Sequence, residues 1–187
     1  MRVLFLVIGL SLATGCSRAQ AVDEAKPYGR ACVTVVDAAA KTEALFTAGT
    51  PPGPERFVTV HLDASAPCEA LVAAFAKKDG RLAFGWRSAM LALPEWEEQP
   101  VGEQHWAWKS AAEPFEVFVL FFAPGSADAA QLKKLVAAMQ EPKSEAQPSE
   151  VAGVLRGASL PWRKSARARN FTTEQPGVLI FPSTPAK

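Results

Sequence analysis

The sequence is poor in the residue types that most often build a catalytic or metal site. It has only two histidines, His61 and His105, and three cysteines, and none of them falls into a CxxC or HxxxH spacing. Zinc sites and dithiol redox sites depend on such spacings, so neither chemistry is indicated. GxSxG, SxxK, HExxH and glycine-rich phosphate-loop patterns are missing as well. We therefore expect no metal, no cofactor and no catalytic residue.

An excess of charge of one sign is also lacking. Twenty Lys and Arg face nineteen Asp and Glu, for a formal net charge of +1, which gives no overall attraction to nucleic acid. The 187 residues, 49% of them hydrophobic, suit one globular domain with tails. Fifteen prolines and twelve glycines imply many turns, which favours a strand-rich fold over a helical bundle.

The N-terminal apolar segment, Val3 to Leu12, is only ten residues long. About twenty are needed to span a bilayer, so this segment is typical of an export signal. It leads into Leu12-Ala13-Thr14-Gly15-Cys16, which resembles the lipobox of bacterial lipoproteins although Ala13 replaces the commoner leucine. The resemblance implies removal of residues 1–15, acylation of Cys16 and a membrane-tethered mature chain. By the same resemblance, Ser17 points to the outer membrane, on its periplasmic side.

Ordinary secretion is the alternative to a lipid anchor. Cleavage after Ala19-Gln20-Ala21 would remove Cys16 and leave a soluble secreted or periplasmic protein. In either case Cys32 and Cys68 remain, an even number in an oxidising compartment, which predicts a disulfide between them. Two free buried thiols are the alternative to that bond.

Composition divides the mature chain into four segments. Residues 16–30 read as a polar tether, 31–140 as a β-rich globular domain and 141–150 as a polar linker. Residues 151–187 form a basic segment with six Lys and Arg against Glu174 alone. Within it, residues 171–174 and 178–181 flank Pro176-Gly177 and predict a hairpin that closes the domain. The basic residues are either solvated or in contact with an anionic surface such as lipid headgroups.

The clearest core segment is 115–122, in which only Glu116 is polar. An apolar run of this length, ended by Pro124-Gly125, predicts a central strand covered on both sides. Ser126 is suited to cap a following helix. Apolar residues then recur at one-sided helical spacing, which places a helix near 127–140; these residues are Leu132, Leu135, Val136 and Met139.

Further strands are expected at 32–36, 57–63 and 105–109. In 57–63 apolar and polar residues alternate, so we expect one wet face with a solvated His61. Residues 69–88 fit either a helix at their start or a hairpin around Asp79-Gly80, a favoured two-residue turn. We predict the hairpin, with Phe75 facing Phe84, Ala73 facing Trp86 and Lys77 facing Leu82, because this register separates most large apolar side chains from the others. The expected fold is therefore a mainly β, antiparallel, sandwich-like domain with one helix.

Three stretches carry a resemblance to a known domain: LVAAFAKKDGRLAFGW, HWAWK and EPFEVFVLFFAPGSADAAQLKKLV. Their succession resembles an uncharacterised β-rich domain of bacterial envelope lipoproteins, which in some chains stands beside kinase or caspase-like domains. The resemblance implies an accessory, sensory or binding module and no established activity. FVLFFAPGSADAAQLKKLV also has the strand-turn-helix order of a thioredoxin, and a thioredoxin-like α+β fold without the CxxC is the alternative architecture.

These observations predict a non-catalytic, membrane-tethered envelope protein that binds a protein partner. The alternative is a glycan- or peptidoglycan-binding module, since the sequence has five tryptophans and one tyrosine. The residues that would stack on sugar rings are Trp96, Trp106 and Trp108.

Overall fold

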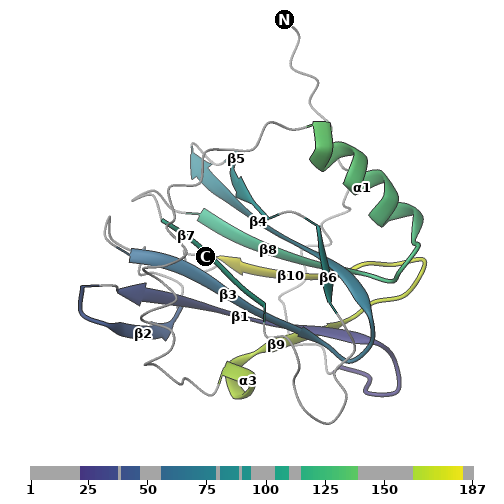
Figure 1. Ribbon diagram of the computed structural model, residues 1–187, viewed down its shortest axis with the longest axis horizontal. Helices are drawn as coiled ribbons and strands as arrows, with labels where there is room; N and C mark the ends of the chain where they lie inside the picture. The colour runs from purple at the N-terminus through teal and green to yellow at the C-terminus, as the bar shows by residue number, and fades with distance from the viewer. Residues whose placement is uncertain are drawn as a thin grey trace, which may run out of the picture.

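The computed structural model describes residues 22–37, 39–46, 56–78, 81–88, 90–93, 104–109, 115–138 and 162–182, with backbone alone at 77–78, 81–87, 104–109, 138 and 163. Strands in these ranges form two antiparallel sheets whose inner faces share one hydrophobic core (Figure 1). One longer helix lies at the border of the molecule. This architecture confirms the predicted mainly β fold with one helix, and the thioredoxin-like alternative is not formed.

The first sheet contains the predicted strands at 32–36, 57–63 and 105–109. Its order is β2 (Thr42–Leu45), β1 (Tyr28–Asp37), β3 (Arg56–Ala64) and β7 (Gln104–Lys109). The short strand β9 (Arg167–Asn170) pairs with the first residues of β1, and β2 pairs with its last residues. Two short strands therefore share one edge of β1, an arrangement that leaves little open edge for intermolecular pairing.

The second sheet is built around the apolar segment 115–122. Its order is β10 (Gly177–Pro182), β8 (Phe115–Phe122), β4 (Cys68–Lys78) and β5 (Arg81–Arg87), and β6 (Leu91–Leu93) pairs with the start of β4. The central position of β8 is as predicted. The prediction that β8 is covered on both sides is wrong, because Phe118 and Leu120 on its outer face are only half-buried.

The hairpin of β4 and β5 resolves the ambiguity between helix and strand in favour of the strand. Phe75 pairs with Phe84 and Lys77 with Leu82, as the sequence predicts. Further from the turn, Trp86 pairs with Ala74 and not with the predicted Ala73, because the register shifts between Ala74 and Phe75. The shift leaves Gly85 as the extra residue of a β-bulge, a position that glycine often occupies.

The core lies between the two sheets and draws alternate residues from their strands. Ala31 and Val33 from β1 and Val58, Val60 and Leu62 from β3 meet a layer from the second sheet that consists of Ala70, Val72, Ala74, Val117, Val119, Phe121, Leu179 and Phe181. Because side chains alternate along a strand, the intervening residues of each strand lie on the outer face of its sheet. Both outer faces carry features that matter for function.

The helix α1 (Ala127–Ala138) starts where the sequence predicts. The hydroxyl of Ser126 accepts a hydrogen bond from the backbone N–H of Ala129 at 3.2 Å, so Ser126 is the N-cap. Gly125 precedes it at φ +75°, a conformation that favours glycine. Lys133 of α1 forms an ion pair with Glu69 of β4, which ties the helix to the second sheet.

The predicted closing hairpin is wrong. β9 belongs to the first sheet and β10 to the second, so the segment from 167 to 182 crosses between the sheets and does not fold back on itself. A local turn does form, but at residues 172–175, where the N–H of Thr172 is bonded to the carbonyl of Gln175 at 2.8 Å, and not at Pro176-Gly177, since Gly177 already belongs to β10. Each flanking strand pairs with a distant strand because those edges offer long antiparallel partners.

The two ends of the described chain add smaller differences. β1 begins at Tyr28, so the last residues of the predicted tether belong to the first sheet. The four-residue helix α3 (Trp162–Ser165), which the sequence does not predict, precedes β9 and packs against β1. Among the described residues, no helix is both long and apolar enough to cross a membrane.

Candidate functional site

Several of the predicted site residues lie outside the part of the chain whose side chains the structure describes. Cys16 and Trp96 are outside the described ranges, and Trp106 and Trp108 are described by their backbone alone. The register of β7 pairs Trp106 with Val60 and Trp108 with Val58, two fully buried core residues. No observation on the described residues favours the sugar-stacking alternative.

The predicted disulfide is not formed. Cys32 and Cys68 are both free and buried, and they lie on different sheets. Cys68 belongs to the core between the sheets, whereas Cys32 pairs with His61 and alternates with the core residues Ala31 and Val33. Cys32 therefore belongs to the outer face of the first sheet, and the sheet itself separates the two thiols.

Burial also suppresses the reactivity of both thiols. It raises the pKa of Cys32 to about 11, with the Glu43 carboxylate adding to the rise and Arg167 opposing it. It raises the pKa of Cys68 to about 12, with a smaller contribution from Glu69. Because the thiolate is the nucleophile, neither cysteine is a reactive group near neutral pH.

Alkylation should therefore distinguish free thiols at Cys32 and Cys68 from a disulfide between them. In the folded protein at about pH 8, we expect modification at least about 100-fold slower than that of an exposed thiol, because the thiolate is scarce and buried. In denaturant without reductant, both Cys32 and Cys68 should react, as peptide mapping by mass spectrometry would show. If neither reacted until a reductant was added, the disulfide would be present after all.

A set of polar side chains in mutual contact lies on the outer face of the first sheet. Oε1 of Glu43, on β2, is 2.8 Å from Nε2 of His61, on β3. The hydroxyl of Thr34, on β1, donates to the same Oε1 at 2.5 Å and lies 3.1 Å from Nε2 of His61. We call these three residues the polar cluster.

The polar cluster is covered from outside the sheet. The indole of Trp162, on α3, stacks on the imidazole of His61 with 5.8 Å between ring centroids and 24° between planes. The side chains of His61 and Glu43 are 5% and 1% exposed. The prediction of a solvated His61 is therefore wrong, because Glu43 and Trp162 bury a strand face that its alternation alone marks as wet.

The chemistry of the polar cluster follows from this burial. A carboxylate, an imidazole and a hydroxyl within hydrogen-bond distance are groups that catalyse proton transfer when they face a substrate. Here they face one another beneath Trp162 and are engaged in mutual contacts. The arrangement ties β1, β2 and β3 together and presents no acid or base to the surface.

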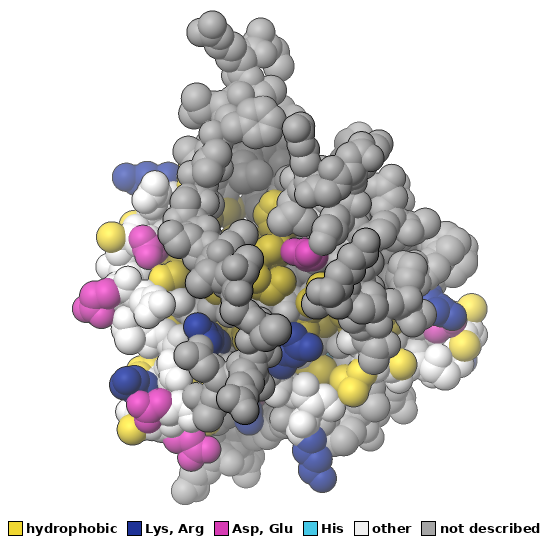
Figure 2. Space-filling view, turned by 180° about the vertical axis from the view of Figure 1, so that it is seen from behind, with side chains coloured by type: hydrophobic (Ala, Val, Ile, Leu, Met, Phe, Trp, Pro, Cys, Tyr) yellow, Lys and Arg dark blue, Asp and Glu magenta, His cyan; other side chains and the backbone are white. Residues whose placement is uncertain are grey.

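The outer face of the second sheet has a different character. Phe75 of β4, Phe118 and Leu120 of β8 and Val178 and Ile180 of β10 form what we call the outer apolar patch. Ile180 pairs with Phe118 and Val178 with Leu120, and Phe75 contacts Phe118 edge-on at 5.2 Å. All five side chains are half-buried or exposed, with Ile180 at 36%. Figure 2 shows hydrophobic side chains reaching the surface near the centre of one face, with charged side chains around them.

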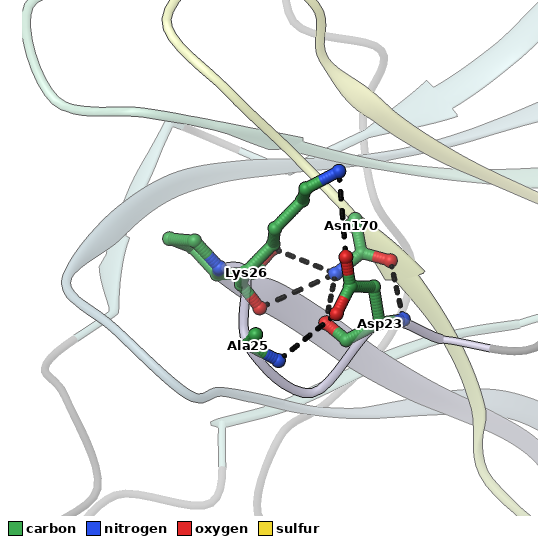
Figure 3. Close-up of polar contacts among 5 residues, drawn as sticks. Asp23, Ala25, Lys26 and Asn170 are labelled. Carbon is green, nitrogen blue, oxygen red and sulfur yellow. Dashed lines mark hydrogen bonds and ion pairs between the residues drawn. The ribbon is translucent and has the colours of Figure 1, made fainter.

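A third feature is the turn at the start of the described chain. The amide of Asn170 donates from Nδ2 to the carbonyls of Asp23, Lys26 and Pro27 at 2.8, 3.2 and 3.3 Å (Figure 3). Its Oδ1 accepts from the N–H of Asp23 at 3.0 Å. One side chain on β9 thus holds the segment that leads into β1, and we call this arrangement the Asn170 clip.

Removing the clip should loosen that segment. For Asn170→Ala we expect hydrogen exchange in a peptide covering residues 22–31 to quicken at least about tenfold, and stability to fall by about 1–2 kcal/mol, because several hydrogen bonds are lost at a mostly exposed site. Asn170→Asp keeps an acceptor for the N–H of Asp23 but has no amide donor, so exchange in this peptide should quicken in that variant too. Unchanged exchange in Asn170→Ala would show that the turn is held by other contacts.

The described residues contain no group of three or more side chains that could hold a metal ion. Comparison of the chain with protein-family models, with curated proteins and with solved structures gave no match. What the protein does is therefore inferred from the residues of the chain itself.

Proposed function

We propose that the protein is a non-catalytic, membrane-tethered module of the bacterial cell envelope that binds a protein partner. The observation that carries the proposal is the outer apolar patch. The outer face of an antiparallel sheet is usually polar, yet here two neighbouring strands present Phe118, Leu120, Val178 and Ile180 side by side. Apolar surface of this kind is typical of protein interaction sites.

The non-catalytic part of the proposal is supported by the position of the titratable groups. His61 and Glu43 are engaged with each other beneath Trp162, and the raised pKa values of Cys32 and Cys68 keep both thiols protonated near neutral pH. A catalytic site needs such groups to converge on a substrate.

The tether is supported by the lipobox-like Leu12 to Cys16 and is tested by intact mass of the mature protein from a Gram-negative host. A mass that begins at Cys16 and includes acyl chains is the expected result. A mass that begins at Val22 would replace the tether with secretion of a soluble protein.

The binding surface is tested by photo-crosslinking in cells, with a photoreactive residue in place of Ile180. Leu45, on β2 of the other sheet, is the matched control because its side chain is similarly exposed, at 44% against 36%. We expect Ile180 to give an adduct with one envelope protein that Leu45 does not give. Ile180→Lys should then abolish co-purification of that protein while leaving the melting temperature within a few degrees, since the change is at the surface. Equal adducts at both positions would contradict the proposed surface, and an adduct of two copies of the chain would replace the partner with self-association.

A further inference from the structure

Basic residues from two distant parts of the sequence line one border of the first sheet. Lys26 lies in the turn before β1, Lys164 on α3, and Arg167 and Arg169 on β9. β9 pairs with the first four residues of β1, and α3, which precedes β9, packs against β1 further along, where Trp162 covers His61. The turn before β1, β9 and α3 therefore follow one another along the same border of the first sheet. We call this group of four side chains the basic edge.

Two of the four charges have no acidic counterpart in the described part of the chain. Lys164 and Arg167 are exposed, and neither lies within ion-pair distance of a described carboxylate. Among the acids in this part of the chain, Asp23 pairs with Lys26 at 3.4 Å and Asp63 with Arg30 at 2.6 Å, and Glu24 is exposed in the turn before β1. The guanidinium of Arg167 is positioned by neutral groups, since it lies 4.9 Å from the centre of the Phe181 ring and donates to the carbonyl of Ile180.

The Asn170 clip limits how far the basic edge can lie from the proposed lipid anchor. Asn170 follows Arg169 directly on β9 and holds the turn that begins at Asp23. Five residues lie between Cys16 and Val22, so even a fully extended chain of six Cα–Cα steps would span at most about 20 Å. This maximum span is roughly two to three Debye lengths at physiological salt. If the chain between Cys16 and Val22 is less than fully extended, the basic edge can contact the headgroups directly.

We propose that the basic edge binds the anionic headgroups of the bilayer that holds the tether. The Lys and Arg side chains would pair with lipid phosphates, and the domain would then stand with the Asn170 clip towards the bilayer. In Figure 1, α1 lies at the opposite border from α3 and β9, so this orientation would hold α1 away from the bilayer. The inference rests on the proposed tether at Cys16.

The test uses the full acylated chain in vesicles and measures how fast an amine-reactive reagent modifies each lysine. Lys164 and Lys26 report on the basic edge, and Lys134 on α1 is the internal control because it is also exposed. We expect Lys164 to react at least about fivefold more slowly in vesicles that contain phosphatidylglycerol than in phosphatidylcholine alone, the factor that corresponds to one basic residue at an anionic surface. Lys134 should react equally in both.

Salt and charge reversal sharpen the test. At about 1 M salt the slowing should disappear, because the Debye length falls to about 3 Å. Lys164→Glu should reduce the protection of Lys26, whereas the matched Lys134→Glu should not. Equal reactivity of Lys164 in the two vesicles would overturn the inference, as would the same slowing by inorganic phosphate without vesicles.

Flotation with phosphatidylcholine vesicles separates failure of the inference from failure of the tether. A chain that floats with these neutral vesicles but shows no protection of Lys164 has a tether and no lipid-binding edge. A chain that floats only with phosphatidylglycerol vesicles and shows the protection has the edge without the tether.

Discussion

Gly29→Ala is expected to destabilise the protein by about 2–3 kcal/mol, measured as the free energy of unfolding in urea. A methyl group at this position would overlap the ring of Phe121, which is fully buried and stacked on Phe171 in the core between the sheets. The ring cannot retreat without disturbing close-packed neighbours, so the cost arises from overpacking.

Gly125→Ala is the matched control for this change. Gly125 has φ +75°, and a methyl group added there would meet no other atom within 4 Å, so overpacking cannot contribute. Its expected cost of about 1 kcal/mol is conformational. Combining Gly29→Ala with Phe121→Leu should cost less than the sum of the two single changes, since the smaller side chain relieves the overlap. Strict additivity would show that the overlap is not the cause.

Glu43→Ala is expected to cost about 2–3 kcal/mol of stability, because it removes the carboxylate to which both the Thr34 hydroxyl and the His61 imidazole are bonded in a buried setting. Hydrogen exchange should quicken in β2 and in α3, since Trp162 stacks on the imidazole that Glu43 orients. Urea unfolding and exchange measured by mass spectrometry give the two readouts.

Two further variants identify the source of that loss. Glu43→Gln keeps an oxygen and the side-chain length, so it should recover about half of the lost stability if hydrogen bonding dominates. Glu24→Ala removes an exposed carboxylate from the turn before β1 and should change stability by less than about 0.5 kcal/mol. If Glu43→Ala behaved like Glu24→Ala, the polar cluster would not be a structural tie between the three strands.

Local patterns in the sequence predict much of this fold. The apolar run of 115–122, the cap at Ser126 and the Asp79-Gly80 turn each act over a few residues, and the elements they predict are all present. The register of the hairpin is right from its turn to Phe75 and Phe84 and fails only beyond the bulge at Gly85. The sequence alone does not show whether a single glycine among apolar residues is paired regularly in the strand or forms a β-bulge.

The errors arise where a distant segment decides the outcome. His61 has the alternation of a wet strand face, but Trp162, about a hundred residues later, stacks on it and helps to bury that face. Glu43 lies in a stretch without periodicity, so nothing local marks it as the partner of His61. The Pro176-Gly177 turn suggests a hairpin, but β9 and β10 find longer partners in β1 and β8. The predicted disulfide depends on cysteine number alone, which contains no information on which side of a sheet each thiol lies.

The crossing of residues 167–182 between the sheets also determines when the domain can fold. β9 completes an edge of the first sheet and β10 an edge of the second, so neither sheet is whole until this late segment is present. A chain released only as far as residue 160 from a ribosome or a translocation channel would lack both strands together with Trp162. Contacts between such distant segments slow folding. Completion of both sheets therefore waits for the C-terminal segment, whichever strands pair before it.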